Sequence, residues 1–176
     1  MEKSDEVNME YNEITRKVIG AAIEAHRELG GPGLLEKVYE AALCKELANA
    51  GLKYRRQVEC PIIYKGENIG DSNHPLRIDI LVEDLVVIEC KAVSEYHPLF
   101  AAQCLTYLRL MKLQLGLVIN FDLEKVVDGI ERVVNPAVGY IPLSQEHLKT
   151  HTETASRSSH EQPIPLPLHP SDSPPL

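Results

Sequence analysis

Two charged residues stand in the middle of an apolar stretch, LVVIECKAV, at residues 85–93. The stretch is short, rich in β-branched residues and free of Gly and Pro, which predicts a buried β-strand. Removing a charged group from water costs several kcal/mol unless a partner compensates for the lost hydration. Glu89 and Lys91 therefore either face water or serve a site that needs a carboxylate and an ammonium side by side.

A second strand is predicted immediately upstream, and it carries Asp79. Side chains alternate along a strand, so Glu89 and Lys91 share one face. If the turn between the strands contains three residues, Val82 pairs with Val86 and Asp79 lies across from Glu89. A two-residue turn would place the two carboxylates on opposite faces of the sheet. We predict the three-residue turn.

Two carboxylates about 5 Å apart across a strand pair repel each other unless a positive charge lies between them. A hard divalent cation such as Mg²⁺ binds one or two carboxylates together with water and phosphate oxygens. Such an ion activates a water molecule for attack on a phosphodiester, and Lys91 would then orient or deprotonate that water or neutralise the transition state. The alternative is a salt-bridge cluster of Asp79, Glu89 and Lys91 on an exposed sheet face.

Apolar periodicity and turn residues indicate the elements that position these side chains. Helices are predicted over residues 11–29, 34–50 and 99–113, and strands over 53–64, 77–82, 86–93, 115–121 and 129–134. This order predicts an α/β or α+β domain with helices packed against a mixed β-sheet. The domain spans residues 11–149, between a flexible N-terminus at 1–10 and a disordered Pro/Ser-rich tail at 150–176.

Composition narrows the class of protein. The chain has 176 residues, 44% of them hydrophobic, and a net charge of −8, so a nucleic-acid role requires a local basic patch or bound cations. No apolar run is long enough for a membrane span, and no signal peptide is recognisable. The four cysteines lie far apart without a CxxC pair, which indicates reduced thiols and a cytoplasmic protein.

Two motifs carry a resemblance to a known family. Residues 33–39, GLLEKVY, resemble the motif that names the GxxExxY protein family, and Asp79 with Glu89-Cys90-Lys91 resembles the D…ExK core of the PD-(D/E)XK nuclease superfamily. The segments AAQCLTYLRLMKLQLGLVINF and DGIERVV follow in the family's order. The resemblance covers roughly residues 10–136.

The resemblance implies a restriction-endonuclease-like core and a site that hydrolyses phosphodiester bonds with Mg²⁺ or Mn²⁺. It implies metal ligation by Asp79, Glu89 and Glu36, and it makes Lys91 the general base or charge stabiliser. Gln103 and Tyr107, four residues apart on one helix, resemble a QxxxY element that supports the site. In the alternative interpretations, Glu36 only complements the helix dipole, and Tyr107, like Tyr39, is a half-buried core aromatic.

Two functions remain open at this point. The first is a metal-dependent DNA nuclease, with Lys53, Arg55 and Arg56 as a narrow basic face for phosphates. The second is a catalytically inactive nuclease-fold module that binds nucleic acid or a protein partner. A homodimer with a composite groove is compatible with either function, and the PxP spacing of the tail could dock on a partner's aromatic groove.

Overall fold

The computed structural model describes residues 3–71, 73 and 75–138, with side chains from residue 10 onward within those ranges. The described helices are α1 (Lys3–Glu28), α2 (Glu36–Asn49), α3 (Leu99–Met111) and the short 3-10 helices η1 (Val126–Gly129) and η2 (Pro136–Val138). The described strands are β1 (Tyr54–Cys60), β2 (Ile63–Tyr64), β3 (Glu67–Asn68), β4 (Leu76–Val82), β5 (Val86–Lys91), β6 (Leu115–Asn120) and β7 (Ile130–Val134).

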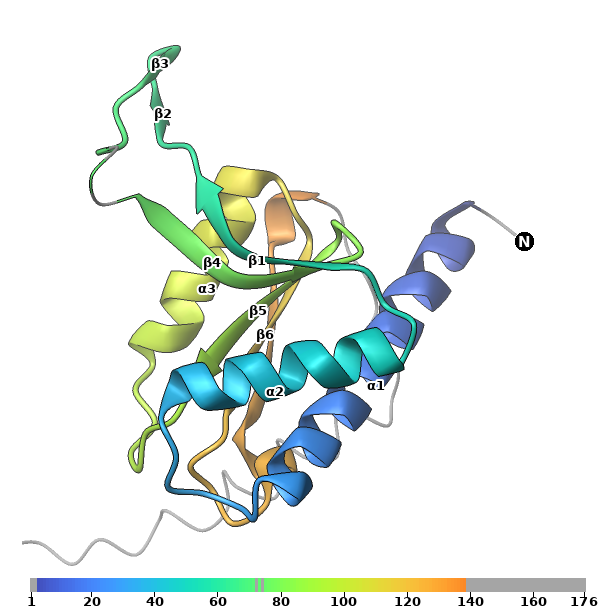
Figure 1. The fold of residues 1–176 in the computed structure, drawn as a ribbon. Coiled ribbons are helices and arrows are strands. Elements are labelled where there is room, and N and C mark those ends of the chain that lie inside the picture. Colours follow the sequence, from blue (N-terminus) through green and yellow to red (C-terminus); the bar gives the residue numbers. More distant parts are fainter. Residues whose placement is uncertain (1–2, 72, 74, 139–176) are drawn as a thin grey trace, which may run out of the picture. The chain divides into compact units, whose positions relative to one another are not determined.

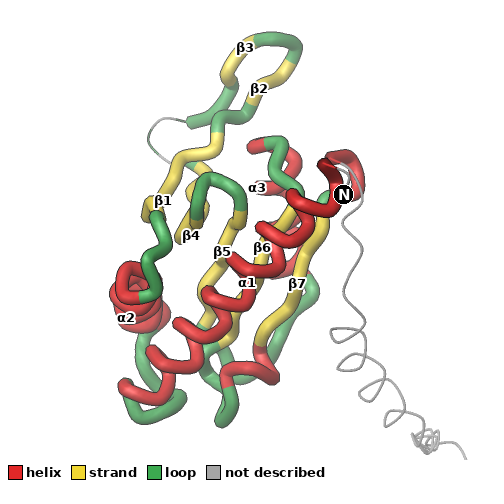
Figure 2. The backbone as a smooth tube through the Cα atoms, turned by 90° about the vertical axis from the view of Figure 1, so that its right-hand side faces the viewer, coloured by secondary structure: helices red, strands yellow, loops and turns green. Residues whose placement is uncertain are grey.

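Five of these strands form one mixed sheet in the order β1-β4-β5-β6-β7. Only the β5–β6 pair is parallel, because α3 provides the crossover connection between these two strands. Helices α1 and α2 cover one face of the sheet and α3 covers the other (Figures 1 and 2). The predicted mixed sheet flanked by helices is therefore confirmed.

Each face of the sheet has its own apolar layer. The layer beneath α1 and α2 includes side chains at most 6% exposed, among them Tyr11, Ile14, Val18, Ala22, Ala25, Tyr39, Leu43 and Leu47. On the other face α3 approaches the sheet closely at Gly116 of β6, where an added Cβ would lie 2.5 Å from the Cys104 sulfur. Strand β6 is buried along its whole length, so the sheet is a rigid central layer.

Most element boundaries lie within two residues of the prediction, and two differ by more. α1 begins at Lys3 rather than at residue 11, because its first turns carry the polar sequence KSDEVNME, in which no apolar stripe signals a helix. The strand predicted over 53–64 is two strands, since Pro61 follows β1 directly and cannot donate to a sheet ladder. β2 and β3 instead form a hairpin that projects from the sheet (Figure 1).

All four cysteines are free and buried, as predicted. None of the described helices has both the length and the apolar character that crossing a bilayer requires. The tail at 150–176 lies outside the described residues.

The turn between β4 and β5 has three residues, which confirms the predicted register. Val82 pairs with Val86, and the ladder continues only as far as Ile80 and Ile88. On its other side β5 remains paired with β6 as far as Lys91. β4 and β5 therefore separate next to Asp79, while β5 keeps its place in the sheet.

Candidate active site

Asp79 lies at the point where β4 and β5 separate. Its Oδ2 atom accepts the Cys90 N–H at 2.9 Å, so the carboxylate takes the place of the missing ladder hydrogen bond. The side chain is only 17% exposed. A carboxylate fixed by the neighbouring backbone has little freedom to rotate away from the residues on β5.

Glu89 and Lys91 project from β5 toward the same region. The Lys91 Nζ atom lies 3.5 Å from Oε2 of Glu89 and 4.0 Å from Oδ2 of Asp79. Nζ also donates to the Cys90 carbonyl oxygen at 2.9 Å and lies 5.7 Å from the centre of the Phe100 ring. The Glu89 side chain is 2% exposed and that of Lys91 is 12% exposed, so the salt-bridge cluster of the alternative interpretation is present, but it is buried and does not lie on an exposed sheet face.

Burial makes the two carboxylates on the strands unusually basic. Loss of hydration, followed by repulsion from Asp79, raises the pKa of Glu89 to about 8, although Lys91 opposes the shift. The pKa of Asp79 is also raised by burial, and the Cys90 N–H and the Lys91 ammonium limit that increase. The site therefore contains more acidic groups than one ammonium neutralises.

Burial alone would lower the pKa of Lys91, but attraction to Glu89, Glu36 and Asp79 outweighs it and raises the pKa above its ordinary value. Lys91 is consequently a protonated ammonium at neutral pH. Its geometry and charge suit it to stabilise negative charge and to donate hydrogen bonds.

Glu36 reaches the same site from α2. It is the first residue of that helix, where the positive end of the helix dipole favours a carboxylate. Burial raises its pKa, attraction to Lys91 lowers it, and repulsion from Asp79 raises it again. The structure thus brings Glu36, Asp79, Glu89 and Lys91 into electrostatic contact, although they come from three separate elements.

The loop before Glu36 is held by Tyr39, the last residue of the GLLEKVY motif. The buried Tyr39 ring stacks on Phe121 with 4.8 Å between centroids. Its hydroxyl donates to the Gly31 carbonyl oxygen at 2.7 Å and accepts the Leu34 N–H at 3.2 Å. Tyr39 is thus a fully buried aromatic whose hydroxyl fixes the loop that delivers Glu36.

The first residue of that motif, Gly33, has φ of +101°, a left-handed conformation that glycine adopts without steric cost. Its N–H donates to Oδ1 of Asp122, just after β6, at 3.1 Å. The glycine and the tyrosine of the motif therefore have a common structural purpose, because both anchor the start of α2 to the end of the sheet.

Tyr39→Phe tests this role. The substitution keeps the ring stacking but removes two hydrogen bonds, so we expect a loss of about 1–2 kcal/mol in the free energy of unfolding. Chemical denaturation measures the loss, and Tyr64→Phe on the exposed hairpin is the matched control. Equal stability of the two variants would show that the hydroxyl does not fix the loop.

Gln103 and Tyr107 face the site from α3. Gln103 Nε2 donates to the Tyr107 hydroxyl at 2.8 Å, and Tyr107 is 3% exposed. The pKa of Tyr107 is raised mainly by burial, with a further contribution from the charge of Glu89. The charge of Glu89 therefore acts on Tyr107. The hydrogen bond described for these two residues joins Gln103 to Tyr107.

A second buried carboxylate, Glu40, was not recognised from the sequence. It lies one helical turn after Glu36 and is 4% exposed. Its Oε1 atom accepts from the Arg56 Nε at 3.0 Å, and the Gln57 amide donates to both carboxylate oxygens at 3.3 Å. The available signal was the i,i+4 spacing of the two glutamates, which places them on one helix face.

The backbone of Gln57 explains how two consecutive residues reach one carboxylate. Neighbouring side chains of a regular strand point to opposite faces, but Gln57 has φ of +49°. This left-handed conformation costs a non-glycine residue about 1–2 kcal/mol. The β1–β4 ladder includes the flanking pairs Arg56–Ile80 and Val58–Ile78, which places Gln57 directly opposite Asp79.

The three residues of the predicted basic face, Lys53, Arg55 and Arg56, have different partners. Arg55 pairs with Asp84 in the β4–β5 turn, and the Lys53 backbone N–H donates to the Glu83 carboxylate in the same turn. Only Arg56 turns toward α2 and the acidic site. Lys53 and Arg55 line one surface hollow together with Glu83 and Asp84, and a phosphate-binding role for this face stays a prediction.

The donor set suits a hard divalent cation. The carboxylates of Asp79 and Glu89 both lie beside Lys91, the charge of Asp79 acts on Glu36, and Oε1 of Glu89 is buried without a hydrogen-bond partner among the described residues. Mg²⁺ and Mn²⁺ bind oxygen ligands of this kind. Within residues 10–71, 73 and 75–138, however, no three His, Cys, Asp or Glu side chains already form a metal-binding cluster.

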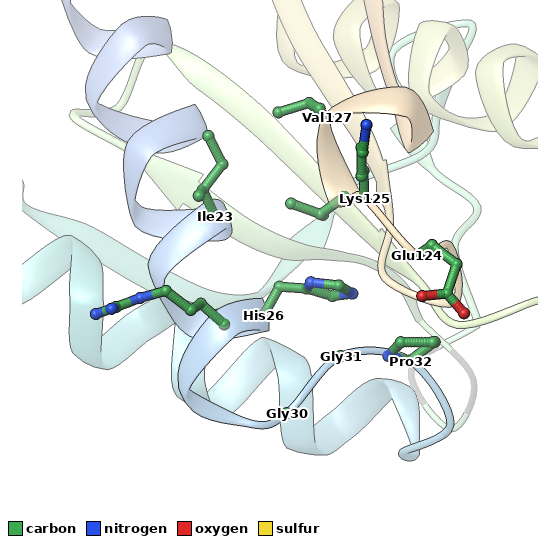
Figure 3. Close-up of a pocket in the computed structure, with 10 residues that line it drawn as sticks. Ile23, His26, Gly30, Gly31, Pro32, Glu124, Lys125 and Val127 are labelled. Atoms are coloured by element: carbon green, nitrogen blue, oxygen red, sulfur yellow. The ribbon is translucent and has the colours of Figure 1, made fainter.

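A separate cavity of about 490 Å³ lies between the end of α1 and η1 (Figure 3). It is lined by His26, by Gly30, Gly31 and Pro32 of the loop, and by Lys125. None of the predicted site residues lines it. Its relation to the site is indirect, through the loop that continues to Glu36.

Sequence comparison was made independently of this geometry. A family model described as the PD-(D/E)XK nuclease superfamily matches residues 12–133. Searches of the curated proteins and of the solved structures found no match. The helices and the five-stranded mixed sheet are consistent with the restriction-endonuclease-like fold.

Proposed function

Because this chain belongs to the PD-(D/E)XK nuclease superfamily, we propose that it is a divalent-metal-dependent nuclease that hydrolyses phosphodiester bonds in DNA. The observation that carries the proposal is the meeting of Asp79, Glu89 and Lys91 where β4 and β5 separate. A site of this composition can receive a metal ion and a phosphate, because an ammonium lies within 4.0 Å of one oxygen of each of two carboxylates.

Asp79 and Glu89 are the proposed ligands of Mg²⁺ or Mn²⁺, with Glu36 as a third ligand in an outer position. When bound, such an ion lowers the pKa of a coordinated water and neutralises charge on the phosphodiester. The unpartnered Oε1 atom of Glu89 supports its assignment, because a buried carboxylate oxygen without a hydrogen-bond donor is suited to a cation.

Lys91 is the proposed stabiliser of the charge that develops in the transition state. Its raised pKa favours this role over that of general base, because the ammonium keeps its proton at neutral pH. Gln103 and Tyr107 are the proposed supporting pair on α3, joined to each other by a hydrogen bond and close enough for the charge of Glu89 to act on Tyr107.

The second candidate is a nuclease-fold module that binds without catalysing a reaction. Two observations favour it: the acidic net charge of −8, and the absence of a ready metal-binding cluster among the described residues. The two functions are distinguished by metal-dependent cleavage of plasmid, linear and branched DNA by the purified full chain. Cleavage that requires Mg²⁺ or Mn²⁺ supports the nuclease, and binding without cleavage supports the module.

Asp79→Asn provides an independent test by calorimetry. The amide oxygen can still accept the Cys90 N–H, so the fold is preserved while the negative charge is lost. We expect Mn²⁺ affinity to fall at least about tenfold and DNA cleavage to fall with it. Asp84→Asn in the exposed β4–β5 turn is the matched control; equal Mn²⁺ affinity in both variants would contradict the proposed ligand role.

In this proposal the catalytic domain spans residues 11–149. The proposal also places the protein in the cytoplasm, where four free and buried thiols remain reduced.

A further inference from the structure

Glu40 joins α2 to β1 in an unusual way. The carboxylate is buried, whereas the Arg56 side chain that it binds is 44% exposed. Arg56 contacts Oε1 of Glu40 through both its Nε and NH2 atoms at 3.0 Å, and the Gln57 amide binds the same carboxylate. One buried acid therefore orients two neighbouring donors, one of them a half-exposed guanidinium.

The other arginines of β1 and β4 are held differently. Arg55 and Arg77 pair with Asp84 and Glu59, and both partners in each pair are exposed. Exposed pairs of this kind exchange freely with water and add little order to the side chain. Arg56 is anchored by an acid that cannot turn toward solvent, so its guanidinium is pre-oriented, which lowers the entropy lost when it binds a further anion.

The position of this group relates it to the proposed catalytic carboxylates. Glu40 is one turn from Glu36, and its charge acts on both Glu36 and Asp79. Gln57 lies opposite Asp79 in the β1–β4 register, and its strained backbone allows its amide to share Glu40 with Arg56. Backbone strain of this kind persists where the surrounding structure maintains it, and it is concentrated at functional sites.

We propose that Arg56 and Gln57, held by Glu40, form a phosphate-binding subsite beside Asp79. This inference rests on the nuclease function proposed above. The subsite binds the backbone phosphate next to the one that is cleaved. The Nε–Nη2 edge of the Arg56 guanidinium faces Glu40, so its Nη1 and outer Nη2 N–H groups are left to form an end-on fork with phosphate oxygens. In a chain of net charge −8, a pre-oriented cation at the edge of an acidic site provides the local attraction that a polyanion requires.

The test uses the full chain with a short fluorescein-labelled DNA duplex, in Ca²⁺ so that binding is measured without turnover. The variant is Arg56→Gln combined with Glu40→Gln, because removal of the arginine alone would leave a buried carboxylate unpaired and could unfold the protein. We expect DNA affinity to fall about tenfold and the dependence of log affinity on log salt to lose about one unit of slope.

Arg55→Gln combined with Asp84→Asn is the matched control, since it removes an ion pair at the adjacent residue of β1 and likewise leaves the net charge unchanged. It should change neither the affinity nor the salt slope appreciably. Gln57→Gly tests the Gln57 donor alone: glycine accepts the left-handed backbone, which offsets part of the loss of the two hydrogen bonds to Glu40, so the protein should stay folded while DNA binding weakens.

Equal loss of affinity in the Arg55 and Arg56 variants would overturn the proposal, because it would show only a general effect of charge. Wild-type affinity in the Glu40/Arg56 double variant would overturn it as well, and would leave the salt bridge as a link between α2 and β1. Absence of cleavage by the wild type would contradict the nuclease function, but Arg56-dependent binding would still support the subsite.

Discussion

Replacement of Lys91 by alanine is expected to reduce DNA cleavage on the order of 10³-fold, the largest effect of any single substitution in the site. The ammonium lies 3.5 Å from Glu89 and 4.0 Å from Asp79. Without it, the carboxylates have no fixed cation among their described neighbours, and a phosphodiester in the site loses its charge stabiliser. Single-turnover cleavage at saturating Mg²⁺ measures the loss in the chemical step.

Lys45→Ala is the matched control for this prediction, because Lys45 is exposed on α2. It should cleave DNA at the wild-type rate. Lys91→Arg keeps the charge in a larger side chain and should retain more activity than Lys91→Ala if charge is the essential property. Thermal unfolding of every variant excludes a loss of fold. A wild-type rate in Lys91→Ala would contradict the assigned role.

The free energy of unfolding is expected to fall as pH rises, when no divalent cation is added. The folded-state pKa of Glu89 is about 8, compared with an ordinary value of 4.5. Between these values the folded protein binds more protons than the unfolded chain does, so stability decreases with pH. The contribution is fully present below pH 4.5 and is lost as pH rises through about 8. The slope approaches about 1.4 kcal/mol per pH unit for one proton.

Urea denaturation across this range tests the prediction by comparing the wild type with Glu89→Gln. The variant keeps the shape of the side chain without its charge, so its stability should depend less steeply on pH. Glu59→Gln, which changes an exposed carboxylate, should follow the wild-type curve. Parallel curves for the wild type and Glu89→Gln would show that burial of this carboxylate does not govern the pH dependence.

Added Mn²⁺ should stabilise the wild type most at the high end of the same range. The ion binds the ionised carboxylates of the folded state, and binding to the folded state raises the free energy of unfolding. Glu89→Gln should gain less from the ion. A uniform gain across pH in both proteins would indicate that the cation binds elsewhere.

The sequence by itself determined the parts of the site that depend on local periodicity. Alternation along β5 placed Glu89 and Lys91 on one face, and the length of the β4–β5 turn set the register that brings Asp79 beside them. These relations hold between residues close in the chain, so that the backbone geometry of one hairpin suffices to establish them.

The tertiary structure decided the rest, because burial and contacts between distant segments leave no local pattern. The near-complete burial of Glu89 depends on the elements that pack around β5, and the place of Glu36 depends on how the Tyr39 hydroxyl holds a loop. The sharing of Glu40 by Arg56 and Gln57 depends on a left-handed residue in β1, a conformation that the propensity of glutamine does not favour. Such a conformation is maintained by the folded surroundings, and only the packed structure reveals it.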